Sequence, residues 1–471
     1  MQTIVIGGGI SGLACAYRLR QLGIPVLLLE QGSRVGGVID SVEQEGFLFE
    51  LGPQSFQSTD TLLELIDALG LSGELVRANP RAPRYVLVDG QLRRAPLTPP
   101  ELLTTSLLGV ATKWRVLSEP FRRSKPPLED ESVAEFTRRK FGSELLEHLV
   151  GPFVSGVYAG DPERLSLRSA FPAIYQWEND YGSVLRGAMR SRPAKGKARS
   201  SLCTLREGVA ALVRALGSKL GDSLRCGARV TQVAAGKAEG RAALELQVND
   251  GGRGEVLPAA AVVLATDTLS AGRLLAGLTA EFPKYFEAIS YAPVAVVGTG
   301  YRREQVGHPL DGFGFLVARK EMLRVLGCVW NSSLFPGRAP KGMVNLTCFA
   351  GGATDREVCQ WSEERIAESV AGEIAGALKI TGSPLKRLVR RHTGALPQYN
   401  LGHGKTMEAL REACARYPGL YLTGNYLEGP SVGACVEQAF RTAEAVRGYL
   451  GSGAAAAGTR ALQQSAVPGR L

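Results

Sequence analysis

The stretch Thr3-Ile-Val-Ile-Gly-Gly-Gly-Ile-Ser-Gly12 opens the chain with a short apolar run that leads directly into three consecutive glycines. Residues 13–22 (LACAYRLRQL) then carry apolar side chains at helical spacing, so the sequence predicts a strand, a glycine turn and a helix. In this order Gly7 allows a sharp turn, Gly9 lets backbone N–H groups approach a pyrophosphate, and Gly12 lets the helix pack on the strand. The positive end of the helix would face the phosphates.

A carboxylate follows at the distance that this motif needs. The second apolar run, residues 25–29, ends at Glu30, which lies 18 residues beyond Gly12. An acidic group at this position can accept hydrogen bonds from both ribose hydroxyls. A glycine-rich packing turn is the alternative, and the position of Glu30 favours a bound adenine dinucleotide over it.

The composition sets the class of protein. The 471 residues include 55 Lys and Arg against 45 Asp and Glu, a net charge of +10, and 45% of them are hydrophobic. This balance excludes a disordered polymer, and the length suggests two to four packed units. The eight Cys form no CxxC pair and the four His have no helical spacing, so we expect reduced thiols and no metal site. Because residues 2–6 already form a predicted strand, we expect no secretory signal.

Two further segments indicate which dinucleotide is bound. Residues 33–38 (SRVGGV) follow Glu30, and residues 47–56 (FLFELGPQSF) predict a strand that ends in a second tight turn. These segments resemble the amine-oxidase-like flavoprotein superfamily, in which an arginine before two glycines wraps the FAD pyrophosphate and the Gly-Pro turn lies along the isoalloxazine. The alternative for Arg34 is a cation in a solvated loop.

The same superfamily pattern returns in two distant parts of the chain, residues 205–270 and 419–450. The resemblance places the backbone at Val230 against the adenine, and residues 424–425 and 432–434 against the ribityl chain and the flavin ring. It implies one non-covalently bound FAD per chain. The predicted cofactor contacts are Gly7, Gly8, Gly9, Ile10, Ser11, Gly12, Glu30, Arg34, Gly37, Val38, Gly52, Pro53, Gln54, Ser55, Val230, Ala265, Gly424, Asn425, Val432, Gly433 and Ala434.

We therefore predict an α/β fold with a Rossmann-like FAD-binding domain of the GR2 or amine-oxidase type. A mixed-sheet substrate domain and a helical insertion complete it, and the apolar stretch 101–117 is expected to be helical. The FAD domain is expected to comprise residues 1–80, 204–270 and 396–450, and the substrate domain residues 81–94 and 271–395. Residues 95–203 form the insertion and 451–471 a flexible tail.

A narrower resemblance covers nearly all of residues 1–450. The chain is similar to the oxygen-dependent protoporphyrinogen oxidases, above all in the segments GPFVSGVYAGDPERLSLRSAFP (151–172) and LPQYNLGH (396–403), which are specific to the porphyrinogen oxidases. Further matching segments are PRYVLVDGQLRRAP (83–96), DGFGFLV (311–317), VLGCVWNSSLFP (325–336) and YLEGPSVGACVEQA (426–439).

This resemblance implies the six-electron oxidation of protoporphyrinogen IX to protoporphyrin IX, with O₂ as acceptor and H₂O₂ as product. Oxidation of coproporphyrinogen III to coproporphyrin III, by an enzyme of the same fold, is the alternative. An amine oxidase, a carotenoid desaturase and a non-catalytic tetrapyrrole carrier are further alternatives. The reaction requires little beyond a hydride acceptor and correct positioning, which agrees with the absence of a His/Asp or Ser/His constellation near the FAD segments.

The resemblance also assigns substrate contacts. Arg84 matches the arginine that pairs with a substrate propionate, and a surface arginine is its alternative. Gly156 matches the glycine whose carbonyl faces the reacting ring, and we count it as the catalytic position; a helix-breaking glycine is the simpler alternative. Four positions match residues that sandwich the tetrapyrrole, although they could equally be plain sheet core: Phe313, Leu316, Val329 and Phe349.

The insertion and the positive charge suggest partners. Residues 101–117 are apolar beside Lys113, Trp114 and Arg115, and the loop 190–199 carries five cations and no acid. We expect a cytoplasmic protein held peripherally on the inner membrane; a soluble helical subdomain is the alternative. No run reaches the roughly 18 apolar residues of a spanning helix. A hand-off to ferrochelatase and a homodimer are further expectations, and nucleic acid is disfavoured because the basic loop has no aromatic residue.

Overall fold

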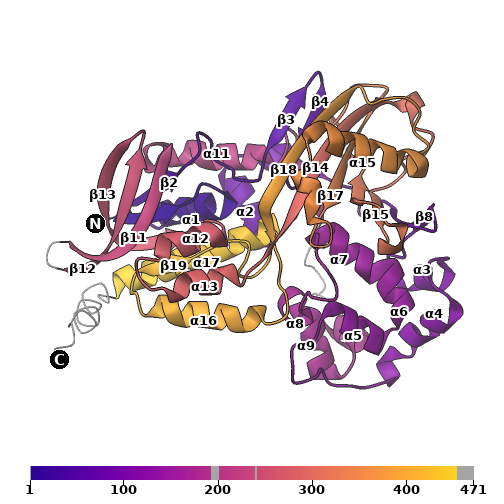
Figure 1. The fold of residues 1–471 in the computed structure, drawn as a ribbon, viewed down its shortest axis with the longest axis horizontal. Coiled ribbons are helices and arrows are strands. Elements are labelled where there is room, and N and C mark those ends of the chain that lie inside the picture. Colours follow the sequence, from indigo (N-terminus) through magenta and orange to yellow (C-terminus); the bar gives the residue numbers. More distant parts are fainter. Residues whose placement is uncertain (1, 192–200, 239–240, 453–471) are drawn as a thin grey trace.

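Two seven-stranded sheets and a separate group of helices make up the computed structural model, which describes residues 2–191, 201–238 and 241–452. The chain leaves and re-enters the first sheet several times, so residues far apart in sequence meet there (Figure 1). The sequence-based prediction of an α/β fold with a Rossmann-like part, a mixed sheet and a helical insertion is confirmed.

The first sheet has a parallel part and an antiparallel part. Its strands run in the order β10-β2-β1-β13-β12-β11. Strand β19 pairs with the last residues of β13, Val262 to Leu264. Strands β10, β2, β1, β13 and β19 are parallel, whereas β11, β12 and β13 form an antiparallel meander. Their bounds are β1 Gln2–Ile6, β2 Val26–Glu30, β10 Leu224–Cys226, β11 Ala228–Ala238, β12 Arg241–Asp250, β13 Arg253–Leu264 and β19 Leu420–Leu422.

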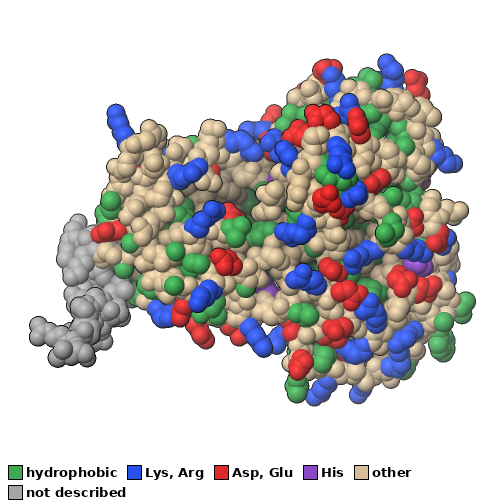
Figure 2. Space-filling view, viewed as in Figure 1, with side chains coloured by type: hydrophobic (Ala, Val, Ile, Leu, Met, Phe, Trp, Pro, Cys, Tyr) green, Lys and Arg blue, Asp and Glu red, His purple; other side chains and the backbone are tan. Residues whose placement is uncertain are grey.

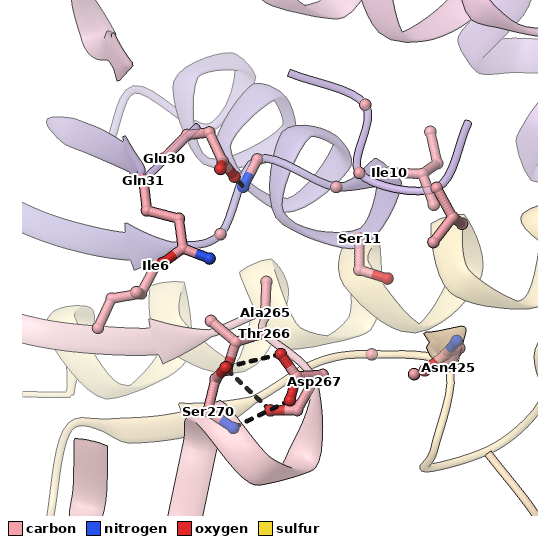
Figure 3. A pocket seen from close by; sticks show the side chains of 18 of the residues that line it. Ile6, Ile10, Ser11, Glu30, Gln31, Ala265, Thr266, Asp267, Ser270 and Asn425 are labelled. Carbon is pink, nitrogen blue, oxygen red and sulfur yellow. Dashed lines mark hydrogen bonds between the residues drawn. The ribbon is translucent and has the colours of Figure 1, made fainter. Parts of the chain in front are cut away.

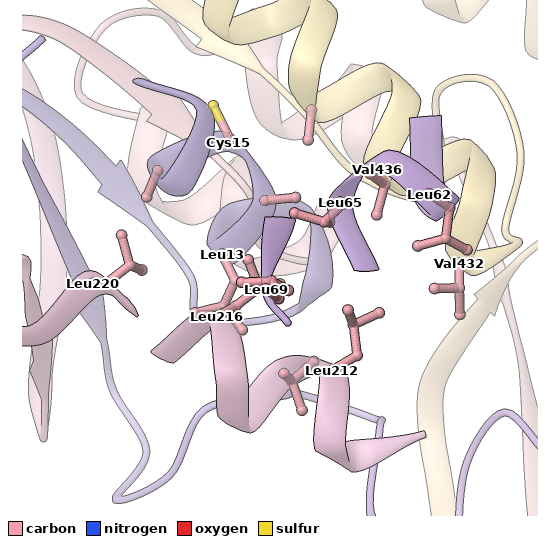
Figure 4. Close-up of a cluster of buried hydrophobic side chains, with 14 of the residues drawn as sticks. Leu13, Cys15, Leu62, Leu65, Leu69, Leu212, Leu216, Leu220, Val432 and Val436 are labelled. Atoms are coloured by element: carbon pink, nitrogen blue, oxygen red, sulfur yellow. The ribbon is translucent and has the colours of Figure 1, made fainter. Parts of the chain in front are cut away.

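Helices cover the parallel strands on one face. On the other face, the parallel strands pack against side chains of the meander and of three more helices. Side chains alternate along β1, so Val5 packs with the first group and Ile4 and Ile6 with the second. Figure 4 shows the first group, where leucines of α1, α2 and α11 meet valines of α17. The first group comprises α1 Ile10–Gln21, α2 Asp60–Ala68, α11 Ala210–Leu220 and α17 Val432–Gly451, and the second α12 Thr268–Leu275, α13 Glu281–Glu287 and α16 His403–Ala415. Burial on both faces explains why β1 reads as a continuous apolar run.

The second sheet is mixed and runs in the order β18-β14-β17-β16-β15-β7-β8. Helix α15 (Glu363–Leu378) covers one face, where Ile366, Val370 and Ile374 enter the core. The strands are β7 Arg84–Val88, β8 Gln91–Arg94, β14 Tyr291–Arg302, β15 Gly314–Val317, β16 Val325–Val329, β17 Met343–Gly351 and β18 Lys386–Pro397.

Buried polar side chains join the second sheet to the first sheet and its helices, which we call the FAD-type part after the sequence prediction. The amide of Asn345 on β17 donates to the carbonyl of Leu48 on β4 (Phe47–Glu50) at 2.8 Å. The guanidinium of Arg338 lies 3.5 Å from the Glu50 carboxylate and donates to the Thr204 hydroxyl at 2.6 Å. Burial raises the pKa of Glu50 although Arg338 opposes the shift. Since these groups are buried and hydrogen-bond to one another, the contact fixes how the two parts sit together.

Four more short strands complete this joint. Strand β3 (Ser41–Gln44) pairs with β4, while β5 (Phe56–Gln57) and β6 (Leu75–Arg77) both pair with β9 (Leu202–Leu205). Strand β9 therefore returns the chain from the insertion to the FAD-type part.

The helical insertion lies between β8 and β9. Its α-helices are α3 Pro99–Thr104, α4 Val110–Leu117, α5 Val133–Lys140, α6 Ser143–Leu145, α7 Gly151–Tyr158, α8 Leu167–Ala170, α9 Pro172–Tyr181 and α10 Val184–Arg190. The expectation of helix over 101–117 was partly wrong, because the helix is interrupted between α3 and α4. The intervening Leu107 and Leu108 are buried, and Gly109 begins α4 as its N-cap. Burying the leucines against the second sheet requires that break.

Two predicted segments lie partly or wholly outside the described residues. The basic loop 190–199 falls there from residue 192, and the C-terminal tail from residue 453. Within the parts of the chain that are described, no helix has both the length and the apolar character needed to cross a bilayer. The domain boundaries given above stay predictions.

Candidate functional site

A cavity of about 720 Å³ opens at the carboxyl ends of the parallel strands of the first sheet. This is where ligands bind in open α/β sheets, and the volume suits a sizeable ligand. It is lined by Ile6, Gly7, Gly8, Gly9, Ile10, Ser11, Leu29, Glu30, Gln31, Gly36, Gly37, Val38, Ile39, Pro53, Ala228, Arg229, Val230, Thr231, Ala265, Thr266, Asp267, Ser270, Arg273, Leu274, Tyr291, Gly394, Gly424, Asn425, Pro430, Val432 and Cys435. Three distant segments of the chain therefore meet around one space.

The glycine turn forms one wall of the cavity. Strand β1 ends at Ile6 and α1 begins at Ile10, with Gly9 as an N-cap that has no side-chain partner. A Cβ on Gly9 would meet no other atom within 4 Å, whereas a Cβ on Gly12 would lie 1.9 Å from the carbonyl oxygen of Gly7. Gly9 thus leaves the helix N-terminus open to the cavity, and Gly12 allows the helix and the turn to touch.

Glu30 stands at the end of β2 beside this turn. Its carboxylate accepts hydrogen bonds from the backbone N–H of Gly8 and of Gly32, each at 2.6 Å. Figure 3 shows the Glu30 side chain reaching toward the glycine turn at the edge of the cavity. The carboxylate holds the two loops together and keeps acceptor capacity for a ribose.

Away from Glu30, the cavity is lined by Pro53, Asn425, Val432 and Cys435, and Figure 3 shows Asn425 on that side. The N–H of Gly424 donates to the buried amide oxygen of Gln438 at 2.9 Å, which anchors the turn before α17. Burial raises the pKa of Cys435 to about 11, so this thiol is protonated and uncharged at neutral pH.

Seven of the predicted cofactor residues do not line the cavity: Gly12, Arg34, Gly52, Gln54, Ser55, Gly433 and Ala434. Arg34 turns back into its own loop, where its guanidinium donates to the carbonyls of Val35, Gly37 and Ile39 and lies 3.5 Å from Asp40. The contact of these seven residues with a cofactor stays a prediction.

A buried polar chain links the cavity to the second sheet. The amide of Asn331 donates to the amide oxygen of Gln54 at 3.0 Å and to the Thr347 hydroxyl at 2.7 Å. Gln54 in turn donates to the carbonyls of Glu50 and Gly52. The loop that carries Pro53 is therefore fixed against β17, so the cavity ends beside the second sheet.

Four of the predicted substrate residues lie on one face of the second sheet. In its ladders Arg84 pairs with Gly314, and Gly314 pairs with Val329; Leu316 and Phe349 both pair with Gly327. Paired residues share a face and alternate residues return to it, so Arg84, Leu316, Val329 and Phe349 point away from α15. We call this the site face. Its three apolar side chains are half-buried.

Phe313 adjoins the site face just before β15. Its half-buried ring lies under the guanidinium of Arg84, with 5.4 Å between Cζ and the ring centroid. This cation–π contact holds an exposed arginine over an aromatic ring.

Gly156 lies on α7, which covers part of the site face. A Cβ at Gly156 would approach the Cδ2 atom of Leu316 to 2.3 Å. The glycine therefore lets the helix come close to the sheet, and the structure brings Gly156 together with a predicted substrate residue.

Some cavity-lining residues of β11 and of the start of α12 were not predicted, among them Arg229, Asp267 and Arg273, whereas Val230 of β11 was. Asp267 caps α12 by accepting a hydrogen bond from the N–H of Ser270 at 2.9 Å. Arg229 and Arg273 also line the cavity. Strand β13 followed by Ala-Thr-Asp is a strand-to-helix junction with an N-cap residue, which could have indicated this part of the wall. Over the described ranges, no group of three or more His, Cys, Asp or Glu could hold a metal ion.

Comparison with known proteins adds to this geometry. Residues 10–447 match the family described as flavin containing amine oxidoreductase. The chain is 34% identical to "Protoporphyrinogen oxidase, chloroplastic" of Oryza sativa subsp. japonica, over 95% of this chain and 88% of the relative. It is 30% identical to "Coproporphyrinogen III oxidase" of Bacillus subtilis (strain 168), over 92% of this chain and 95% of the relative.

A solved structure from Exiguobacterium sp. 255-15 superimposes on the chain with a TM-score of 0.79. Its sequence is 27% identical, and the match covers 94% of this chain and 98% of the other. The similarity therefore extends through both sheets and the insertion.

Proposed function

We propose, starting from the fact that the chain belongs to the flavin-containing amine oxidoreductase family, that it oxidises protoporphyrinogen IX to protoporphyrin IX with O₂ as the electron acceptor and H₂O₂ as product. Family membership makes the protein an oxidoreductase with a flavin. The substrate and the acceptor are the proposal. The observation that carries it is the site face, an apolar surface with one flanking arginine that adjoins the end of the flavin cavity.

We propose that the flavin is a single FAD bound without a covalent bond. The cavity fits this group because it joins an open helix N-terminus and a ribose acceptor at one end to the loops of Pro53 and Asn425 at the other. When bound, the flavin supplies an acceptor for two electrons at a time. The predicted residues Gly7 to Gly12 and Glu30 would hold the dinucleotide.

The chain's own contribution to the reaction is positioning. Phe313, Leu316, Val329 and Phe349 would hold a flat apolar macrocycle and exclude water from it, and Arg84 would pair with a propionate at the rim. The acidic residues that line the cavity within the described ranges are Glu30 and Asp267, and both are engaged at the nucleotide end. We therefore assign no carboxylate of this cavity as the base for a pyrrole N–H proton.

Coproporphyrinogen III is the second candidate substrate, and the name of the Bacillus subtilis relative favours testing it. This porphyrinogen carries more carboxylates than protoporphyrinogen IX. Among the four residues that define the site face, Arg84 is the one cation that could pair with a carboxylate. The site face therefore favours protoporphyrinogen IX, which has fewer carboxylates.

One assay tests the function and the substrate together. Purified protein is mixed in air with protoporphyrinogen IX and, separately, with coproporphyrinogen III, and porphyrin fluorescence is followed. We expect enzyme-dependent fluorescence that develops faster with protoporphyrinogen IX. Faster development with coproporphyrinogen III would assign the alternative, and no enzyme-dependent fluorescence with either would refute the proposal. A primary amine in the same assay tests for amine oxidase activity.

We also propose that the insertion rests on a membrane surface. Val110, Trp114 and Leu117 of α4 are 83%, 71% and 41% exposed at helical spacing, and Phe121 is 81% exposed. Arg115, Arg122 and Arg123 are exposed beside them. Figure 2 shows hydrophobic side chains at the outer edge of the insertion, next to Lys and Arg. An apolar strip flanked by cations suits an anionic lipid surface.

Vesicle flotation tests this contact. A Trp114→Ser, Phe121→Ser variant is compared with wild type on phosphatidylglycerol vesicles, and Met322→Ser, which removes an 87% exposed side chain from the second-sheet part, serves as control. We expect the double variant to lose binding about tenfold or more. Equal flotation of all three would refute the contact. Peripheral location on the cytoplasmic face, transfer of product to ferrochelatase and a homodimer remain predictions.

A further inference from the structure

Residues 396–403 (LPQYNLGH), which we call the strap, connect the second sheet to α16 and pair with the insertion on the way. The backbone N–H of Ser166 donates to the carbonyl of Tyr399, and that of Leu401 donates to the carbonyl of Arg164, both at 2.8 Å. Leu165 and Asn400 form an antiparallel bridge between these bonds. Backbone hydrogen bonds on both sides of one bridge thus join the strap to the insertion.

Tyr399 carries this contact to the flavin cavity. The side chain is 2% exposed, its ring centroid lies 4.6 Å from that of His403, and its hydroxyl donates to the backbone carbonyl of Asn425. Asn425 lines the cavity, and Gln438 holds the neighbouring Gly424 from α17. Burial strongly raises the pKa of Tyr399, so the hydroxyl remains a hydrogen-bond donor at physiological pH.

The same wall is therefore held by two different parts of the fold. Gln438 fixes it from α17, inside the FAD-type part, whereas Tyr399 fixes it through a segment bonded to the insertion. Without the hydroxyl, the partly buried carbonyl of Asn425 would lose this hydrogen bond, and residues 424–427 would keep the contacts of Gln438 and His403.

We propose that Tyr399 is a positioning residue that sets the Asn425 wall of the cavity and ties it to the insertion. This inference rests on the proposed function, since the group that the wall would contact is the flavin. Through Tyr399, a shift of the insertion, or of a partner docked on it, would move the wall that faces the cofactor.

The test compares Tyr399→Phe with wild type and with Tyr417→Phe. Tyr417 is a matched control, because its hydroxyl also donates to a backbone carbonyl, that of Leu278 at 2.7 Å, but it does not line the flavin cavity. Three quantities are measured on each purified holoprotein: the rate of flavin release, the flavin absorption spectrum, and hydrogen–deuterium exchange of peptides that contain residues 424–427.

We expect Tyr399→Phe to release flavin about tenfold faster than wild type, to shift the flavin spectrum, and to exchange faster over residues 424–427, because one buried hydrogen bond is lost. Tyr417→Phe is expected to leave all three unchanged. Release within about twofold of the control, with superimposable spectra, would overturn the inference. Hydrogen exchange of the holoprotein reads the wall without any substrate, so failure of the proposed function would be seen separately.

A second variant keeps the test valid if Tyr399→Phe does not fold. Asp130 of the insertion is exposed and accepts from the Ser166 hydroxyl at 2.7 Å and from the N–H of Gly402 in the strap at 3.0 Å. We expect Asp130→Ala to speed flavin release by about twofold to threefold and to raise exchange over 424–427. No change in either quantity would overturn the link to the insertion.

Discussion

The two ends of the candidate site are built in different ways. At the nucleotide end, residues within a single short segment, 6–11, line the cavity, and Glu30 completes it from the next strand. At the substrate end, the site face draws one side chain each from β7, β15, β16 and β17, and α7 packs onto it through Gly156. A backbone-built site depends on local geometry, whereas a side-chain-built site depends on the packing of distant elements.

The largest effect is expected from a change at the nucleotide end. Gly12→Val would place a branched side chain where even a Cβ lies 1.9 Å from the Gly7 carbonyl oxygen, so the turn and α1 would have to separate. We expect the variant to lose flavin affinity by at least about 100-fold. Flavin absorbance of the purified chain measures this.

The control for Gly12→Val is Gly376→Ala on α15, where a Cβ meets no atom within 4 Å. An exposed helix accepts Ala well, so this variant is expected to keep its flavin. A Gly12→Val chain with wild-type flavin content would show that the glycine turn does not form the nucleotide end.

The next effect concerns the strap, which lies between the two ends. Burial lowers the pKa of His403 from the ordinary 6.5 to about 4, so the folded chain holds this imidazole neutral while the unfolded chain protonates it. Stability contributed by the neutral form is therefore complete above pH 6.5 and is lost as the pH falls toward 4. The loss is expected to reach about 2 to 3 kcal/mol.

Chemical unfolding of wild type and His403→Gln, at neutral pH and near pH 4, measures this contribution. Loss of the contact with Tyr399 affects the variant at both pH values, so the difference between the two conditions isolates the proton. The wild type is expected to lose more stability on acidification than the variant. Equal losses would mean that water reaches His403.

At the substrate end, Gly156→Ala is expected to lower kcat/KM for the porphyrinogen about 30-fold while flavin content stays unchanged. The added methyl would push against Leu316, 2.3 Å away, and so displace the site face from α7. The estimate corresponds to about 2 kcal/mol of overpacking. If the variant lost flavin instead, the two ends would not be independent.

The smallest effect is expected at the rim. Arg84 is exposed and touches Phe313, so Arg84→Ala removes a screened charge rather than a buried one. We expect KM to rise about tenfold, with kcat and flavin content little changed. Arg84→Lys should give an intermediate KM, and unaltered kinetics in both variants would remove the propionate contact.

The difference between the ends also explains what the sequence could predict. The glycine turn, Glu30 and the neighbouring strands follow from spacing within 30 residues, so their geometry could be expected directly. The position of Arg34 could not, because the competition between a phosphate and the carbonyls of its own loop is not visible in a motif. Asp267 and Arg273 were missed since they come from a segment with no glycine signature.

At the substrate end the residue types were predictable only through resemblance. Which face of a strand points to the site depends on ladder register, and only the paired strands show that Leu316, Val329 and Phe349 share a face. The break between α3 and α4 has a similar cause, because apolar periodicity over 101–117 does not reveal that Leu107 and Leu108 are buried against the second sheet. Tertiary packing decided both.

The most direct test of the account is anaerobic. Purified flavin-containing protein is mixed with protoporphyrinogen IX in the absence of O₂, and the absorbance of the oxidised flavin is followed. The account predicts that the flavin is bleached by the substrate and that its absorbance returns when air is admitted. A flavin that stays oxidised in the presence of excess porphyrinogen would contradict it and would leave the protein a carrier rather than an oxidase.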